Sequence, residues 1–290
     1  MVDRKYVAGL QSGRQADAHD RGGRLFPGAH MRSQLVAVTI AAGLAIGAGD
    51  GSKAEAKPSS TRAAVDPDAI AALQKMGAFL RDQQKFAVRA NVTTDDLLPS
   101  GQKVQFDGTM ELMVRRPDRM RADVRGDRQD ERIYYDGKTF TIFGEKVGYY
   151  ASFEAPATLA ELKDVTEKRY GIDLPLADLF YWGTEHDGTS DITAATKVGV
   201  GTVEGTACDH YAFRQKDVDW ELWIEQGPHP LPRKMVITTT SEKSRPQHGM
   251  VLDWDLAPKF ADELFTFAPP PEAHKIEFDT SVGRSASSHQ

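Results

Sequence analysis

Residues 103–116 read KVQFDGTMELMVRR, and this stretch decides the fold class. Phe106, Met110 and Leu112 occupy even positions, whereas charged or polar side chains occupy most of the odd ones. A period of two is typical of a β-strand with one buried face and one solvated face. Residues 103–116 are therefore predicted to form a strand of a sheet that packs on one side.

The same alternation continues along most of the chain as far as residue 256. Asp136-Gly137 indicates a tight hairpin, because both central positions of a type I′ turn need positive φ, and Glu204-Gly205 is expected to turn the chain as well. Short connections make successive strands antiparallel neighbours. About ten strands exceed what a flat sheet tolerates, so we expect a curled, unclosed antiparallel β-barrel.

Two helices are predicted where the period of two is absent. The first covers residues 65–81, where Asp66 can cap the helix and Pro67 suits its first turn. The second begins with Thr158 and Glu161, a pair that matches the capping box in which each side chain satisfies a free backbone donor.

A further short helix is expected from Pro175 to Trp182. It is apolar on nearly every side, and such a helix should be buried or should cover something. The predicted fold class is therefore mainly β (α+β), with helices plugging the concave face of the sheet.

The N-terminal part of the chain predicts export from a bacterial cytoplasm. Residues 31–56 contain a basic start, a short apolar run and Ala54-Glu55-Ala56, which together are typical of a secretory signal peptide. The apolar run has about 14 residues, fewer than the roughly 20 that span a bilayer. The expected organisation is a misassigned N-terminal extension at 1–30, the signal peptide, a linker at 57–64, the folded domain at 65–279 and a disordered tail at 280–290.

The composition excludes several classes of function. The net charge of -6 leaves no basic excess to neutralise phosphates, so nucleic acid is not an expected partner. The one cysteine, Cys208, excludes an intrachain disulfide and a cysteine-based zinc site, and we expect it to be a packed thiol. No transmembrane span is expected once residues 31–56 are removed.

Few residues suggest catalysis. Gly199–Gly205 departs from a dinucleotide fingerprint, because its third glycine is one residue late and strands flank it. His186–Asp191 could hold a metal but reads equally as turn formers, and Asp209-His210 lies within a strand. Asp253 and Asp255 share a strand face that is normally charged. We therefore predict no catalytic residue, no metal and no cofactor.

The large apolar side chains on the buried face of the predicted strands have two possible roles. Either they fill a core, which any half-buried sheet needs, or they line a hydrophobic cavity, for which aromatic and methionine side chains are adaptable surfaces. The candidate ligand-binding residues are Phe106, Met110, Leu112, Met120, Tyr135, Tyr149, Phe153, Leu176, Leu179, Phe180, Trp182, Tyr211, Phe213, Trp220, Leu222, Met235, Leu252 and Trp254.

Three segments of the sequence resemble a known group of proteins. They read MELMVRRPDRMRAD from Met110, YYDGKTF from Tyr134, and LWIE from Leu222 with LPRKMVI from Leu231. They are similar to periplasmic lipoprotein carriers of the LolA/LolB type, and residues 65–275 resemble more closely an uncharacterised family of predicted periplasmic proteins allied to that fold. The resemblance implies an unclosed barrel with a helical lid and a cavity for acyl chains, and it carries over no catalytic residue.

The leading functional hypothesis is a periplasmic carrier that binds an acyl chain, a lipid or a lipidated protein without catalysis. A chain of about 14 methylenes could gain on the order of 11 kcal/mol from burial before ordering costs, without any polar motif. The alternatives are an envelope protein–protein interaction or stress-sensing module and, with less support, a hydrolase whose site the sequence does not reveal.

Overall fold

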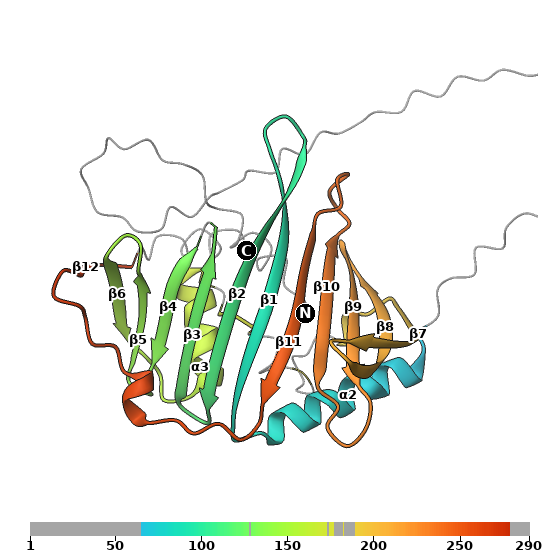
Figure 1. Cartoon of the computed structure of the whole chain (residues 1–290), viewed down its shortest axis with the longest axis horizontal. Coiled ribbons are helices and arrows are strands. Elements are labelled where there is room, and N and C mark those ends of the chain that lie inside the picture. Colours follow the sequence, from blue (N-terminus) through green and yellow to red (C-terminus); the bar gives the residue numbers. More distant parts are fainter. Residues whose placement is uncertain (1–64, 128, 173, 177–181, 183–188, 279–290) are drawn as a thin grey trace, which may run out of the picture.

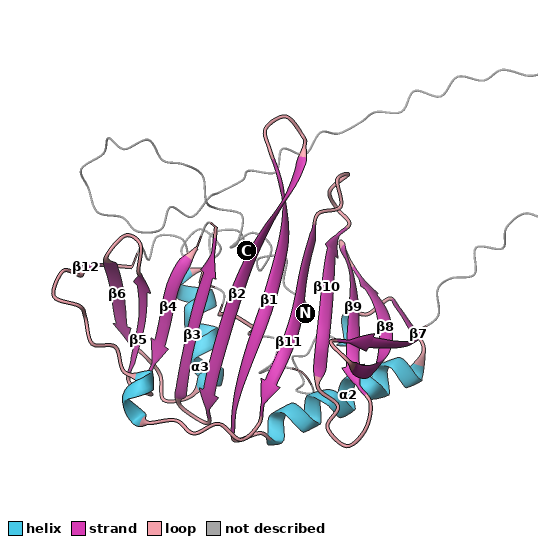
Figure 2. Cartoon of the chain, in the orientation of Figure 1, coloured by secondary structure: helices cyan, strands magenta, loops and turns pink. Residues whose placement is uncertain are grey.

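The computed structural model describes residues 65–127, 129–172, 174–176, 182 and 189–278. Within these residues one twelve-stranded sheet curls around two α-helices and is not closed, since β12 and β7 form its two ends (Figures 1 and 2). The mainly β fold class and the unclosed antiparallel architecture predicted from the sequence are therefore confirmed.

The strands follow the order β12-β6-β5-β4-β3-β2-β1-β11-β10-β9-β8-β7 across the sheet. Every pair is antiparallel except β12 with β6, which is parallel. The bounds are β1 Lys85–Leu97, β2 Lys103–Arg115, β3 Arg119–Gly126, β4 Asp130–Tyr135, β5 Thr139–Gly144, β6 Tyr149–Glu154, β7 Ala194–Val203, β8 Thr206–Gln215, β9 Val218–Glu225, β10 Pro232–Thr239, β11 Gln247–Asp255 and β12 His274–Ile276.

The central strand β1 was not among the predicted strands. Phe86, Val88 and Ala90 alternate as a strand requires, but the chain continues with threonines and aspartates, which are less typical of a strand. β1 pairs with β2 along its whole length and with β11 on its other side. It therefore joins two meanders, β2–β6 and β7–β11, into one sheet. With the short edge strand β12 this makes twelve strands rather than about ten.

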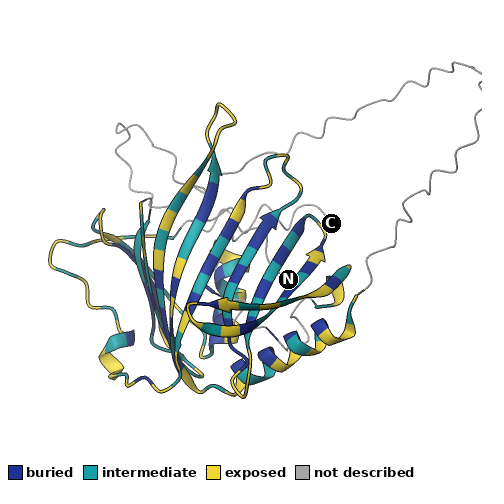
Figure 3. Ribbon diagram, turned by 45° about the vertical axis from the view of Figure 1, so that its right-hand side comes forward, coloured by how far each residue is buried: buried dark blue, intermediate teal, exposed yellow. Residues whose placement is uncertain are grey.

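The strand register places the predicted apolar residues on one face, here called the inner face. Met110 lies opposite Ala90 of β1 and Val124 of β3, and Ala90 lies opposite Leu252 of β11. The same phase continues into the other strands, and buried residues alternate with exposed ones along them (Figure 3). Side chains of both helices join these residues in a single hydrophobic cluster, so the core lies between the inner face and the helices.

The two predicted helix starts are confirmed. α2, Pro67–Asp82, begins after Asp66, whose carboxylate accepts a hydrogen bond from the backbone N–H of Asp68 at 2.9 Å. α3, Leu159–Val165, begins with half of the predicted capping box, since the Glu161 N–H donates to Thr158 Oγ1 at 3.3 Å. The Glu161 carboxylate accepts from the Thr158 hydroxyl at 2.9 Å and not, as predicted, from a backbone N–H. A π-helical turn, Thr166–Tyr170, follows.

The helix predicted over 175–182 is wrong where the structure describes it. Leu176 has φ of 52°, which ends any right-handed helix at that residue, and Pro175 and Trp182 lie in turns. Residues 177–181 lie outside the described residues. The expected burial nevertheless holds, because Leu174, Leu176 and Trp182 are all buried.

The two predicted turns differ in type. Glu204 and Gly205 both have positive φ, 46° and 84°, as a type I′ turn requires. At Asp136-Gly137 only the glycine does, with φ of 82°, so the predicted type I′ turn is wrong there although the hairpin exists. The Asp136 carboxylate instead accepts hydrogen bonds from the backbone N–H groups of Lys138 and Thr139, at 3.0 and 2.8 Å.

Residues 260–267 close the domain on the outer face of the sheet. The turn of 3₁₀ helix Asp262–Phe265 seats the fully buried Phe265 beneath Arg115, whose guanidinium lies 2.7 Å from Asp262. Phe267 then packs on three rings that point outward, those of Tyr134, Phe143 and Tyr150.

The chain next passes around the edge of the sheet. β12 adds to β6, and Phe278 reaches the inner face, where its ring meets those of Phe153 and Tyr170 at 5.5 and 5.3 Å (Figure 1). The C-terminal segment 260–278 thus clamps the β6 edge from both faces.

This clamp predicts a large loss of stability for Phe265→Ala. Removing a fully buried phenylalanine typically costs about 3–5 kcal/mol, because the cavity cannot collapse completely. Urea unfolding should show this loss, whereas the half-buried neighbour Phe260, changed to alanine, should cost clearly less. Equal stabilities of Phe265→Ala and the wild type would show that segment 260–267 does not hold the sheet.

Candidate hydrophobic binding site

The inner face collects most of the residues predicted to line a cavity. Ten of them are buried on the sheet, namely Met110, Leu112, Met120, Tyr135, Tyr211, Phe213, Trp220, Leu222, Met235 and Leu252. Phe106, Phe153 and Trp254 lie on the same face and are half-buried. Leu179 and Phe180 lie outside the described residues.

Tyr149 does not belong to the enclosed part of the face. It has the same strand phase as Ala151 and Phe153, but it begins the short edge strand β6 and is 37% exposed. Its ring packs on His274 of β12, with 5.6 Å between the ring centroids. Strand phase alone could not show that this end of β6 extends beyond the helices.

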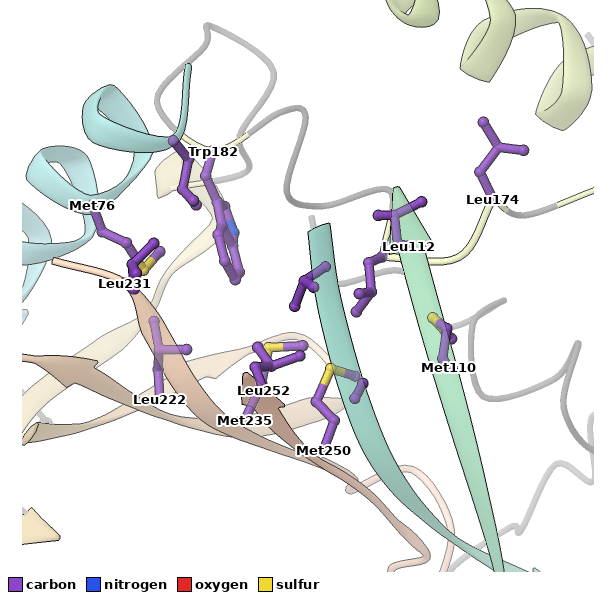
Figure 4. Packing of buried hydrophobic residues seen from close by; sticks show 14 of the residues in the cluster. Met76, Met110, Leu112, Leu174, Trp182, Leu222, Leu231, Met235, Met250 and Leu252 are labelled. Carbon is purple, nitrogen blue, oxygen red and sulfur yellow. The ribbon is translucent and has the colours of Figure 1, made fainter. Parts of the chain in front are cut away.

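Separate elements cover the inner face. Near β9–β11, Met76 of α2 and Trp182 approach Leu222, Leu231 and Leu252, while Leu174 lies on the side of β2 (Figure 4). Near β4–β6, the Tyr170 ring stacks on Phe153 at 4.4 Å, and the Tyr135 hydroxyl donates to the Pro156 carbonyl at 2.6 Å. The cover thus contacts the sheet mainly through side chains.

Methionines are numerous in this interface. Met76, Met110, Met120, Met235 and Met250 are all buried in the cluster. An unbranched thioether adapts its shape more readily than a branched side chain does. An interface of this composition can repack around an inserted apolar group, as the sequence pattern indicated.

An opening lies at the upper end of the inner face, between β1, β2 and β3. Val92, Met110 and Val124 supply apolar walls, and the paired glycines Gly108 and Gly126 supply a floor without side chains. Its volume is about 60 Å³, below the 150 Å³ cavity known to hold benzene in another protein. As it stands the opening suits the end of a ligand, and a longer ligand requires the cover to move.

The glycine floor follows from close packing of the backbone. A Cβ atom on Gly108 would lie 2.9 Å from the Arg125 carbonyl oxygen, and one on Gly126 would lie 3.1 Å from that of Asp107. Glycine inside a strand often marks a place where a backbone or a ligand approaches closely.

The polar side chains at positions of the apolar inner face include those of His248, Trp220 and Glu131. His248 is fully buried with Nδ1 2.8 Å from Thr94 Oγ1, and burial lowers the pKa of His248 to about 4. Trp220 Nε1 is buried without a hydrogen-bond partner, and the ring stacks on Phe213. Glu131 is half-buried on β4, and burial raises the pKa of its carboxyl group.

Sequence reasoning did not single out Glu131 or His248 as functional residues. The sequence nevertheless contained an indication of their inward position. Glu131 alternates in step with the inward-facing Ile133 and Tyr135, and His248 alternates in step with Met250. A polar residue at an inward position of an otherwise apolar series is an informative exception.

Three other polar candidates, His210, Asp253 and Asp255, lie on the outer face, whereas Asp209 has the inward phase, opposite Ile224, and lies 3.1 Å from Lys197 Nζ. The His210 ring stacks on Trp223 at 3.9 Å, with Nε2 2.9 Å from the Glu221 carboxylate. Asp253 lies 3.5 Å from Arg233, and Asp255 accepts a hydrogen bond from the backbone of the following turn. These are ordinary contacts of a solvated sheet face.

Cys208 is a packed thiol, as predicted. It is fully buried, its Sγ lies 3.4 Å from the Thr206 carbonyl oxygen, and burial raises its pKa. Within the described residues, no three His, Cys, Asp or Glu side chains come close enough together to hold a metal ion.

A family model described as "Predicted periplasmic protein (DUF2092)" matches residues 69–279. The chain belongs to the DUF2092 family. This confirms the uncharacterised periplasmic family that the sequence resembled, and with it the periplasmic localisation. A search of curated proteins found no match. Among the helices of the described DUF2092 domain, none is both long and apolar enough to cross a membrane.

Solved structures with a similar fold include three of known source. MucB of Pseudomonas aeruginosa, solved as a MucA/MucB complex, is 17% identical with a TM-score of 0.39. The match covers 69% of the present chain but only 61% of that one. LprF of Mycobacterium bovis is 15% identical, with coverage of 72% and 99% and a TM-score of 0.40. The LolA superfamily protein NE2245 of Nitrosomonas europaea is 12% identical, with coverage of 69% and 97% and a TM-score of 0.28.

The buried histidine predicts a specific loss of stability in acid. The unfolded chain binds a proton at His248 near pH 6.5, whereas the folded chain does so only near pH 4. Stability from this group is therefore complete above pH 6.5 and falls by roughly 3 kcal/mol as the pH drops to 4. Urea unfolding at several pH values should show this slope.

The same titration with His248→Gln should have a flatter slope between pH 6.5 and 4, whatever the variant's stability at neutral pH. His229→Gln, at an exposed loop position, should keep the wild-type slope. A His248→Gln slope equal to that of the wild type would contradict the assignment.

Proposed function

We propose that this DUF2092 protein is a periplasmic carrier that holds the apolar part of a lipid, an acyl chain or a lipidated protein against the inner face of its sheet. The observation that supports this most is the construction of the face. Large apolar side chains of a curled, unclosed sheet meet a cover formed by α2, α3, Leu174, Leu176 and Trp182. No catalytic residue is part of the proposal.

The way the cover is attached favours a movable lid. α2 is tied to the sheet at its start, where the Asp66 N–H donates to the Ala195 carbonyl at 3.0 Å beside the bridge of Val65 to Ala195. At its other end the chain enters β1, where the Arg116 N–H donates to the Gln84 carbonyl at 2.8 Å. Between these two ends, the contribution of α2 to the cluster comes from side chains such as Leu73, Met76 and Leu80. If a ligand displaces such a helix, apolar contacts between the helix and the sheet are replaced by apolar contacts between the ligand and the sheet. The strand pairing stays intact.

The energy of burial is large enough for this mode of binding. Each buried methylene contributes about 0.8 kcal/mol, so an acyl chain can offset both its own ordering and the displacement of the lid. The resemblance to LolA-type carriers in the sequence supports the same function.

The direct test is native mass spectrometry of the protein purified from its own periplasm, followed by extraction and analysis of any lipid. We expect a lipid adduct in near-stoichiometric amount. Protein that carries no lipid, and that binds no uncharged fluorescent lipid after delipidation, would contradict the carrier function.

A second candidate function rests on the sheet edge. Val198 and Val200 of the edge strand β7 are 55% and 68% exposed. An exposed apolar edge strand is a template for an added strand. This observation favours an envelope protein partner, which crosslinking and pull-down with a β7 variant would detect.

A substitution at the opening separates ligand binding from folding. Val124→Trp should fill the space above the glycine floor and weaken binding of an uncharged fluorescent lipid by roughly tenfold, because excluding about two methylenes from burial costs about 1.6 kcal/mol. Val251→Trp, at a half-buried position of the outer face, is the control and should bind normally. Equal binding by both variants, with unchanged thermal melting, would place the ligand elsewhere.

A further inference from the structure

Glu131 is the exception in an apolar row of the inner face. Across the sheet, Leu252, Ala90, Met110 and Val124 lie opposite one another in register, and Glu131 of β4 comes next, opposite Val124. Met110 and Val124 line the opening at the upper end of the face. The carboxylate therefore stands beside that opening at the end of an apolar track.

No side chain in the described part of the chain neutralises the negative charge of the Glu131 carboxylate. Within the described residues the Glu131 side chain makes no hydrogen bond and no ion pair, and burial raises the pKa of its carboxyl group. The neighbouring cations have other partners: Arg132 lies 2.6 Å from Glu145, and Arg121 lies 2.9 Å from Asp123. A half-buried acid without a partner costs stability, since buried charges are normally paired.

The described residues that line the opening have an excess of negative charge. They include three acids, Asp96, Asp107 and Asp127, and one cation, Arg125. The three acids and Glu131 repel an anionic head group, such as a fatty-acid carboxylate. They attract a cation, and a charged hydrogen bond is roughly twice as strong as a neutral one.

We infer that Glu131 receives the polar end of the ligand, and that this end carries a protonated amine. The apolar tail then extends from the opening along the row Val124, Met110, Ala90 and Leu252 beneath the cover. This inference rests on the proposed carrier function and adds to it the chemical class of the head group and its position on the sheet.

The test compares three probes of equal chain length: tetradecylamine, tetradecanol and myristic acid, each below its micelle concentration. Each displaces a fluorescent lipid from the delipidated protein at pH 7. The wild type should bind the amine at least roughly tenfold more tightly than the acid, with the alcohol between them, because a hydrogen bond to a charged group contributes about 1.5–3 kcal/mol.

Two variants assign this preference to one carboxylate. Glu131→Gln keeps the size of the side chain and should weaken amine binding roughly tenfold while changing alcohol binding less than about twofold. Asp130→Asn removes the same charge one residue away, on the outer-face side of β4, and should leave all three affinities unchanged. Thermal melting at pH 7 should show Glu131→Gln at least as stable as the wild type.

The outcomes separate the inference from the proposed function. Binding of all three probes with no preference for the amine, or a preference that Glu131→Gln leaves intact, overturns the head-group assignment while the carrier function stands. Failure of the wild type to bind any of the three overturns both.

Discussion

The pairing of β1 with β11 is the contact on which the rest of the structure depends. β1 is hydrogen-bonded on both sides, to β2 and to β11, and no other pairing connects the meander β2–β6 to the meander β7–β11 within the described residues. Because the strand period is two, the register of these pairs decides which face each side chain joins. A slip of one residue at β1 would turn half of the apolar face toward solvent.

The single continuous face that results is longer than one helix can cover. The cover is shared by α2, α3 and the buried Leu174, Leu176 and Trp182, with aromatic stacking at one side and methionine packing at the other. The C-terminal segment secures the β6 edge through Phe265, Phe267 and Phe278, whereas the opposite edge, β7, stays exposed at Val198 and Val200. One rim of the face is thus clamped and the other is exposed.

Many individual elements were predictable because their causes are local. Asp66, Thr158 and Glu161 cap helices through neighbouring atoms, and the phase of Met110 and Leu112 follows from backbone geometry alone. β1 and Leu176 were not predictable in this way. β1 has two polar aspartates and two threonines near its end because neighbouring strands cover its backbone, and Leu176 has positive φ in a turn that seats its side chain in the core.

The sequence by itself determined the mainly β class, the helix starts, the inward phase of the apolar residues and the membership of a periplasmic family. Each of these follows from the order of side chains along a short stretch of backbone. Only the tertiary structure decided that Val124, Met110, Ala90 and Leu252 form one row, that Glu131 ends this row without a partner, and that Tyr149 lies outside the enclosed face. Those facts depend on contacts between residues up to about 160 positions apart, which no local pattern encodes.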